Sequence, residues 1–174
     1  MIVVLMGVTG SGKTTIGTLL AERTGAVFAD ADDHHPKANR EKMAAGHPLN
    51  DADREPWLEE LNRILLGWFQ AGKSGVLACS ALKAQYRTTL SAQMPAGTVT
   101  FVLLDGSKEL IASRLAARKH EYMNPNLLDS QLATLEMPQD ALRIENDRAP
   151  EQVVDEILAK ISSTQQQDTE KNLK

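Results

Sequence analysis

Short apolar runs alternate along the chain with longer stretches in which apolar residues recur every three or four positions. The apolar runs have the length of buried strands and lie at Ile2–Met6, Val27–Ala29, Gly75–Cys79, Thr98–Leu104 and Leu142–Glu145. Strands that are apolar on both faces need cover on both sides, which the helical stretches between them can supply. The pattern therefore predicts an α/β fold with a five-stranded, mainly parallel sheet flanked by helices.

The helical stretches are bounded by residues that cap or stop helices. They are predicted at Lys13–Thr24, Ala38–Ala45, Leu82–Ala92 and Ser107–Lys119, with one more from Asn50 or Asp51 onward and a last one after Pro150. The helix that starts near Asn50 has a predicted buried stripe of Trp57, Leu58, Leu61, Leu65, Trp68 and Phe69. We expect one domain over residues 1–163, followed by a polar, Gln-rich tail at 164–174 that is predicted to be disordered.

Composition narrows the class of protein. The chain has 174 residues, of which 42% are apolar and 24% charged, and this is ordinary globular composition. A net charge of -4 gives no general attraction to nucleic acid or to anionic lipid, and no apolar run approaches the length of a membrane span. The single cysteine, Cys79, sits in an apolar run and is expected to be buried, and no basic leader precedes the first strand. We expect a cytoplasmic protein that binds neither nucleic acid nor membrane.

The most specific motif is a glycine-rich loop between the first predicted strand and the first predicted helix. It matches G-x-x-x-x-G-K-[ST] and consists of Gly7, Val8, Thr9, Gly10, Ser11, Gly12, Lys13 and Thr14. Its glycines let backbone N–H groups point at an anion, and the helix start adds a positive dipole end. We expect Lys13 to reach the outer phosphates of a nucleotide and the Thr14 hydroxyl to bind Mg²⁺. A plain connecting turn is the alternative, but it would not require the lysine and threonine.

An acidic segment with two histidines, residues 30–36, follows the second predicted strand directly. It should lie at the carboxyl edge of the sheet, where α/β folds bind ligands. Asp32 is the candidate that orients an acceptor hydroxyl and takes its proton, and Asp30 is expected near Mg²⁺. The alternative is a solvated turn that caps a helix. A zinc site is not expected, because His47 and His120 stand alone.

Taken together, several segments resemble the gluconokinase family of shikimate-kinase-like P-loop proteins. They are GVTGSGKT, ADADDHHPKANREKMAAGHPLNDADREPWL, CSALKAQYR and LLDSQLATLEMP, with Arg114 and Arg118 one helical turn apart. The phosphate loop alone indicates only nucleotide binding, whereas the long second segment and CSALK are much narrower. The resemblance implies a three-layer P-loop NTPase fold with strand order 2-3-1-4-5 and a lid at about residues 119–127. It also implies transfer of the γ-phosphoryl group of Mg·ATP to the terminal hydroxyl of D-gluconate.

The resemblance implies roles for further residues. Arg118 and Arg114 would stabilise the transferring phosphoryl group, although a solvated basic helix face is the alternative. Asn146 and Pro150 follow the last strand, where related kinases hold the adenine, unless this is an ordinary connecting loop. The acceptor pocket would be bordered by Asp32, His35, Lys37, Arg40, Lys42, Arg54, Ser80, Lys83 and Arg87. Arg54 is the preferred partner for the acceptor's carboxylate.

The chain departs from the family pattern at three positions. Ala31 replaces a glycine in D-G-D-x-x-H, and His120 and Glu121 stand where relatives often have glycine and histidine. Relatives are often dimers, so a homodimer is compatible with the resemblance. Two rival functions remain: a kinase for shikimate or another small hydroxy acid, and a nucleotide-binding switch without an acceptor.

Overall fold

The computed structural model of the chain describes residues 1–118 and 126–172. Its single sheet has the strand order β2-β3-β1-β4-β5, and every pairing between neighbours is parallel. The strands are β1 (Ile2–Met6), β2 (Val27–Asp30), β3 (Gly75–Ala78), β4 (Val99–Asp105) and β5 (Leu142–Glu145). The predicted fold class and strand order are confirmed.

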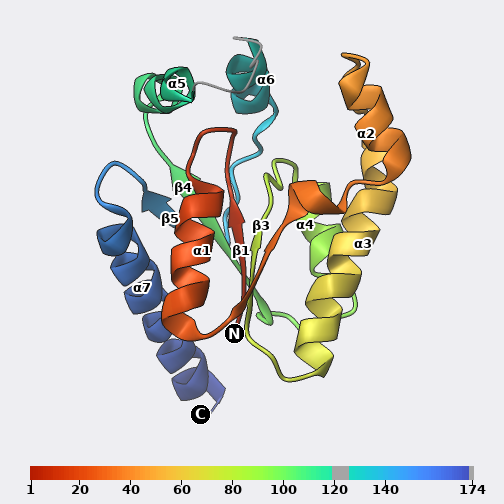
Figure 1. The fold of residues 1–174 in the computed structure, drawn as a ribbon. Coiled ribbons are helices and arrows are strands. Elements are labelled where there is room, and N and C mark those ends of the chain that lie inside the picture. The colour runs from red at the N-terminus through yellow and green to blue at the C-terminus, as the bar shows by residue number, and fades with distance from the viewer. Residues whose placement is uncertain (119–125, 173–174) are drawn as a thin grey trace.

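Helices form a layer on each face of the sheet. They are α1 (Lys13–Thr24), α2 (Lys37–Ala44), α3 (Asp51–Gln70), α4 (Ala84–Leu90), α5 (Lys108–Ala117), α6 (Asn126–Thr134) and α7 (Pro150–Asn172), with a short 3₁₀ helix, η1, at Ala31–His34. Figure 1 shows α1 and α7 on one face and α3 and α4 on the other, while α5 and α6 lie together beyond one end of the sheet. Of the helices in the described ranges, none is both long enough and apolar enough to cross a membrane.

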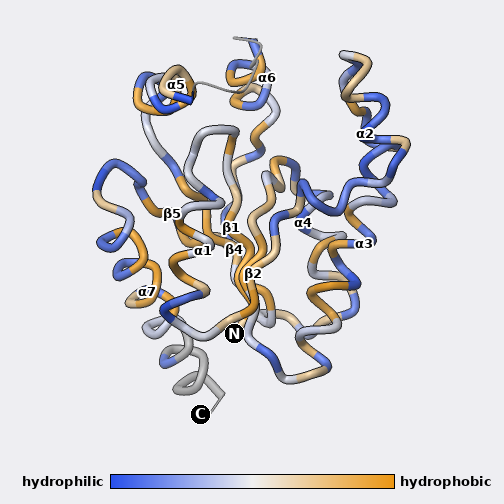
Figure 2. Tube along the Cα trace, in the orientation of Figure 1, coloured by the Kyte–Doolittle hydropathy of each residue, from blue (hydrophilic) through white to orange (hydrophobic). Residues whose placement is uncertain are grey.

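The central strand β1 explains how the two layers are held. Its five side chains are all buried, and they alternate between the faces as strand geometry requires. Ile2, Val4 and Met6 belong to the cluster beneath α3 and α4, whereas Val3 and Leu5 belong to the cluster beneath α1 and α7. Figure 2 shows the apolar residues concentrated along the strands and the inner faces of these helices.

A third and smaller apolar cluster joins α5 and α6 to the loops at the end of the sheet. We call it the cap cluster, and its members are Val8, Leu82, Ile111, Leu115, Leu128, Leu132 and Leu135. Val8 belongs to the phosphate loop and Leu82 to the connection between β3 and α4. The cap cluster therefore holds two loops and two helices that are far apart in sequence.

Cys79 follows β3 and is a buried free thiol, as predicted. It packs in the cluster beneath α3 and α4. Burial raises the pKa of this thiol to about 12. The side chain therefore remains protonated at neutral pH and acts as a small apolar residue.

The structure differs from the sequence-based expectation in several elements. The pattern did not predict η1 or α6, and α4 is shorter than the predicted helix at Leu82–Ala92. Phe69 is 39% exposed, because Trp68 takes the inward position at this end of α3. Helix α7 continues to Asn172, beyond the predicted domain end at residue 163, and the disorder predicted for the tail stays a prediction. The predicted lid lies outside the described residues except for its last two positions, which begin α6.

Gly75 offers a test of how tightly α3 packs on the sheet. A Cβ atom there would lie 2.0 Å from Cε3 of Trp68, which is far inside van der Waals contact. We expect Gly75→Ala to lower the free energy of unfolding by about 1–3 kcal/mol, because the ring or the strand must shift. Denaturant unfolding monitored by circular dichroism measures this change.

The matched control for this substitution is Gly67→Ala. Gly67 lies in α3, and a Cβ atom added there would meet no atom within 4 Å apart from its chain neighbours and the backbone of its own helix. The same added methyl group should here raise the free energy of unfolding by about 0.5–1 kcal/mol, since alanine favours a helix over glycine. If Gly75→Ala proved as stable as the unaltered protein, the contact between Trp68 and β3 would be looser than the structure indicates.

Candidate active site

Three segments meet where the strands β1, β2 and β3 end. Gly7 follows β1, Asp30 ends β2, and Ser80 lies two residues beyond β3. The Gly7 N–H donates to the Ser80 carbonyl at 3.2 Å, so the phosphate loop is joined directly to the loop after β3. Gly7 has φ 144°, and a Cβ atom there would lie 2.8 Å from the Leu104 carbonyl oxygen. Only glycine fits this position.

Lys13 is the first residue of α1 and folds back over the phosphate loop. Its ammonium donates to the carbonyls of Gly7 at 3.0 Å and Val8 at 2.9 Å. Burial lowers the pKa of Lys13, while the carboxylates of Asp32 and Asp30 oppose that change by favouring the charged form. The ammonium is therefore held at the loop and within electrostatic reach of the acidic segment.

Asn146 stabilises the phosphate loop through a hydrogen bond to its backbone. This side chain is buried, and its Nδ2 donates to the Ser11 carbonyl at 2.7 Å. Its own backbone carbonyl accepts from Arg114 at 2.5 Å, and its N–H donates to the Asp105 carbonyl at 2.8 Å. A Cβ atom at Gly12 would lie 2.4 Å from Asn146 Nδ2. Asn146 and Arg114, expected at the nucleotide and phosphoryl group, thus also hold the loop in shape.

Thr14 and Asp30, the expected Mg²⁺ ligands, lie within hydrogen-bonding distance of each other. The Thr14 hydroxyl donates to Asp30 Oδ2 at 2.8 Å, and Asp30 Oδ1 accepts the N–H of Asp32 at 3.1 Å. A hydroxyl and a carboxylate suit Mg²⁺, which usually takes few protein ligands and completes its shell with phosphate oxygens and water. Within the described ranges no group of three or more His, Cys, Asp or Glu side chains could hold a metal. The residues present fit a magnesium ion shared with a nucleotide.

Asp32 projects from η1 with its side chain 89% exposed. His35 Nε2 lies 4.0 Å from Asp32 Oδ1, and the imidazole stacks on the Trp57 indole with ring centroids 4.3 Å apart. Trp57 donates from Nε1 to the Ala31 carbonyl at 2.8 Å and is itself buried in the core, as predicted. Burial lowers the pKa of His35, so the ring is neutral at neutral pH. The turn that carries Asp32 is thereby fixed to α3.

Ala31, where relatives have glycine, is buried in η1. The non-glycine residues with positive φ in the described chain are Ala81 and Gln93, so Ala31 has an ordinary backbone conformation. This position does not need the freedom of glycine.

Several of the predicted acceptor-pocket cations are engaged by the protein itself. Lys42 lies 2.5 Å from Asp53, which also belongs to the capping box of α3. Arg40 donates to the carbonyls of His35 and Asp33, at 3.1 and 2.6 Å. Lys37 is exposed on α2 beside Glu41. Their contacts stabilise the turn and the helix starts.

Arg87 has a structural environment. Its guanidinium donates to the carbonyls of Ala81, Leu82 and Glu136 at 2.9, 3.2 and 3.0 Å. Ala81 has φ 45°, a conformation that costs energy for a non-glycine residue. Arg87 therefore holds a strained loop, and its predicted contact with an acceptor is not tested by this geometry.

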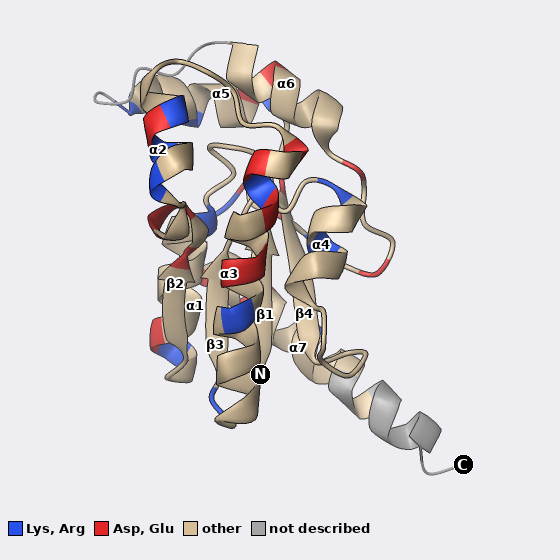
Figure 3. Ribbon diagram, turned by 90° about the vertical axis from the view of Figure 1, so that its right-hand side faces the viewer, with Lys and Arg blue, Asp and Glu red and all other residues tan. Residues whose placement is uncertain are grey.

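Arg54 in α3 and Lys83 just before α4 converge on one carboxylate and one aromatic ring. Lys83 donates to Asp51 Oδ1 and Oδ2 at 3.0 and 2.9 Å, and Arg54 lies 3.8 Å from Asp51 Oδ1. Both cations also lie beside the Tyr86 ring, at 5.9 Å for Arg54 and 5.7 Å for Lys83. Figure 3 shows that charges of both signs are interspersed over α2 and α3. The two cations and the phenol ring thus surround one carboxylate, that of Asp51.

The family model described as shikimate kinase matches residues 9–168, which is most of the chain. The gluconokinase of Gluconobacter oxydans is 45% identical over 159 residues, with 89% of this chain and 88% of the relative covered. The chain belongs to the gluconokinase family. The thermoresistant gluconokinase of Escherichia coli K12 is 41% identical, covering 88% and 89% of the two chains. A crystal structure of a gluconokinase from Sinorhizobium meliloti matches with TM-score 0.82 and 36% identity, covering 93% of this chain and 91% of that one.

Two residues of α6 and its C-terminal extension enter this gluconokinase-family site without having been predicted. Gln131 Oε1 accepts the N–H of Thr9 in the phosphate loop at 2.6 Å. Glu136 accepts the N–H of Ala84 at 2.7 Å and donates its own N–H to the Leu82 carbonyl at 2.9 Å. The segment LLDSQLATLEMP carried the family resemblance but gave no reason to assign these contacts. It links the phosphate loop to the loop after β3.

Arg118 follows the last residue of α5 and caps this helix, and it is the last residue of the first described range. Burial is the main cause that lowers the pKa of Lys13, and the positive charge of Arg118 lowers it further. The two cations therefore lie near each other. The role predicted for Arg118 at the phosphoryl group stays a prediction. His120 and Glu121, the departures from the family pattern, lie outside the described residues.

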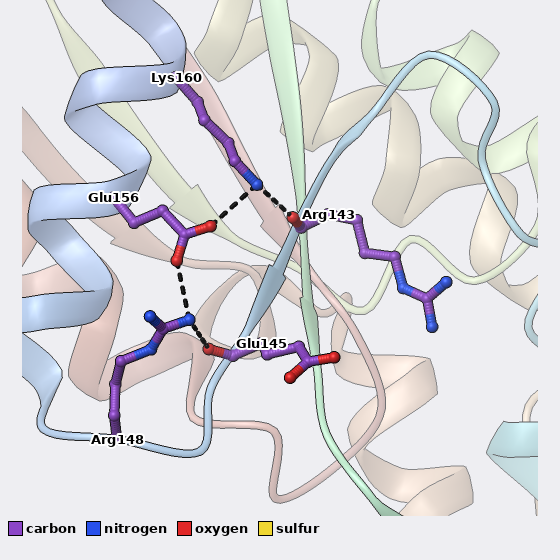
Figure 4. A pocket seen from close by; sticks show the side chains of 5 residues that line it. All are labelled: Arg143, Glu145, Arg148, Glu156 and Lys160. Carbon is purple, nitrogen blue, oxygen red and sulfur yellow. Dashed lines mark hydrogen bonds and ion pairs between the residues drawn. The ribbon is translucent and has the colours of Figure 1, made fainter.

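A second polar pocket lies between β5 and α7 and contains none of the predicted site residues. Its lining is Arg143, Glu145, Arg148, Glu156 and Lys160 (Figure 4). Glu156 pairs with Lys160 at 2.9 Å and with Arg148 at 2.8 Å, and these bonds lower its pKa. None of the residues assigned to the predicted kinase site lines this pocket.

Proposed function

We propose that this chain transfers the γ-phosphoryl group of Mg·ATP to the terminal hydroxyl of D-gluconate, giving 6-phospho-D-gluconate and ADP. The observation that supports the proposal is the link between the acidic turn and the first turn of α1: Asp30 accepts both the N–H of Asp32 and the hydroxyl of Thr14. A carboxylate that faces the phosphoryl donor can orient the acceptor hydroxyl. Membership in the gluconokinase family supports the choice of acceptor.

The donor side of the reaction falls to the phosphate loop. The amides of Gly10, Gly12 and the start of α1 would hold the phosphates, and Lys13 would leave the loop carbonyls to neutralise charge on the γ-phosphate. Thr14 and Asp30 would hold Mg²⁺, which supplies further charge neutralisation when bound. Arg118 and Arg114 would stabilise the three oxygens of the phosphoryl group in flight.

The acceptor side depends on Asp32 and on the cations of α3 and α4. Asp32 would accept the proton of the terminal hydroxyl as the new O–P bond forms and the bond between the β and γ phosphates breaks. Arg54 and Lys83 would bind the carboxylate at the other end of the acceptor. Ser80 and His35 would supply polar partners for the hydroxyl groups of the acceptor. Positioning would supply much of the acceleration.

A kinase for another small hydroxy acid is the second candidate. Such a kinase would use the same phosphate loop and the same acidic residue after β2. The match to the shikimate kinase family model supports this alternative. A non-catalytic nucleotide switch is less well supported, because it gives no role to the convergent Arg54 and Lys83.

Acceptor-dependent ADP release tests the proposal. The assay contains Mg·ATP with D-gluconate, shikimate, other sugar acids, neutral sugars or nucleoside monophosphates, and one sample without acceptor. We expect D-gluconate to stimulate ADP release far more than any other compound. Stimulation by another acceptor would reject gluconate, and ADP release that no acceptor changes would reject the kinase reaction altogether.

A further inference from the structure

We propose that Asp51 is an internal stand-in for the carboxylate of the acceptor, and that the acceptor must displace it from Lys83 and Arg54. This inference rests on the proposed function, because it concerns the same acceptor pocket. It adds a specificity-determining residue that makes no contact with the reacting atoms.

The surroundings of Asp51 are those of a bound carboxylate. Lys83 donates to both of its oxygens, Arg54 lies 3.8 Å away, and the Tyr86 hydroxyl donates to Oδ1. These bonds, of which the one from Tyr86 is the strongest influence, lower the pKa of Asp51. The two cations and the phenol already form a complete set of donors for one carboxylate.

Asp51 is free to leave because it does not hold the helix start. The cap of α3 is Asn50, whose side chain accepts the N–H of Asp53, while the Asp53 carboxylate accepts the N–H of Asn50. Two ion pairs thus lie side by side at this helix start. The pair of Lys42 and Asp53 is fixed by the capping box, and the pair of Lys83 and Asp51 is not.

The free-energy cost of displacing Asp51 from these cations is also small. Its side chain is 49% exposed, so it can turn into water, and an ion pair in contact with solvent contributes little to stability. Tyr86 is buried and would stay in place, with its ring still beside both cations. The anion site therefore survives the departure of Asp51.

The exchange favours acceptors that carry a carboxylate. An acidic acceptor restores every bond that Asp51 gives up, whereas a neutral polyol cannot, and two carboxylates on the same donors would repel. Asp51 thus discriminates against neutral sugars by occupying the site until an equivalent group replaces it.

The test is Asp51→Asn, which keeps the shape of the side chain and removes the competing charge. We expect the KM for D-gluconate to fall about three- to tenfold, since less binding energy is lost in displacing an exposed ion pair. The KM for ATP and kcat should each change by less than about twofold. Asp51→Glu, which keeps the charge, should retain the KM of the unaltered protein for D-gluconate.

A double-mutant cycle with Lys83→Gln separates competition from a general structural effect. Once Lys83 is gone, Asp51→Asn should alter the KM for D-gluconate much less than it does alone. Asp51→Ser, which suits a helix start, replaces Asp51→Asn if that variant does not fold. A rise in the KM for D-gluconate, or an equal change in the KM for ATP, would overturn the proposal. No turnover of gluconate by the unaltered protein would instead refute the proposed function.

Discussion

Lys13→Ala is expected to lower kcat/KM for phosphoryl transfer about 10²- to 10³-fold, because one preorganised charge is lost from the phosphoryl group in the transition state. In the structure this ammonium donates hydrogen bonds to two backbone carbonyls of the phosphate loop, those of Gly7 and Val8. A phosphate group that binds Lys13 would replace these two hydrogen bonds to carbonyl oxygens. Steady-state ADP release with varied ATP measures the effect.

The matched control for Lys13→Ala is Lys160→Ala. Lys160 lies on α7 in the second pocket, where it pairs with Glu156. Removing it should leave kcat/KM within about twofold, in line with an exposed ion pair remote from the chemistry. A Lys13→Ala variant that folds and keeps the full rate would contradict the assignment of the phosphate loop.

Asp32→Asn is expected to lower kcat about 10²- to 10⁴-fold, the range found when a positioned proton acceptor is removed. The amide keeps the size of the side chain but cannot accept the proton of the acceptor hydroxyl. Binding of ATP should be nearly intact, because the phosphate loop and Thr14 are unaltered. Stopped assays for turnover and titration with a nucleotide measure the two quantities separately.

Asp33→Asn is the control next to Asp32. Asp33 is exposed on the same 3₁₀ turn, and Arg40 bonds its carbonyl oxygen, which the substitution preserves. We expect a change in kcat of less than about twofold. Equal losses in the two variants would mean that the acidic turn acts through its net charge and that Asp32 has no individual role.

The sequence predicted the sheet and the phosphate loop well because their signals are local. An apolar run such as Ile2–Met6 reports burial on both faces, and the loop motif lies within eight consecutive residues. The carboxyl ends of parallel strands meet at one edge, so the approach of Asp30 and Thr14 followed from topology alone.

The remaining parts of the site depend on contacts between distant segments. Gln131 meets Thr9 across 122 positions of the chain, and no periodicity reports such a pair. Sequence likewise cannot distinguish a cation that faces a pocket from one that binds carbonyls, which is why Arg87 and Lys83 looked alike. Their surroundings separate them, because Arg87 bonds three backbone oxygens whereas Lys83 bonds one half-exposed carboxylate.

The cap cluster is packed apart from the two main apolar clusters, and this separation concerns the order in which substrates bind. Leu135 is the one member, within the described residues, that also packs against a main cluster. Moving α5 and α6 away from the sheet would break few apolar contacts with the two main clusters, but it would also break the hydrogen bonds made by Arg114, Gln131 and Glu136. Because Val8 and Leu82 share this cover, one such movement would expose the phosphate loop and the loop after β3 together. If both loops became accessible together, either substrate could bind first, and initial-rate kinetics with both substrates varied would show a random order of addition.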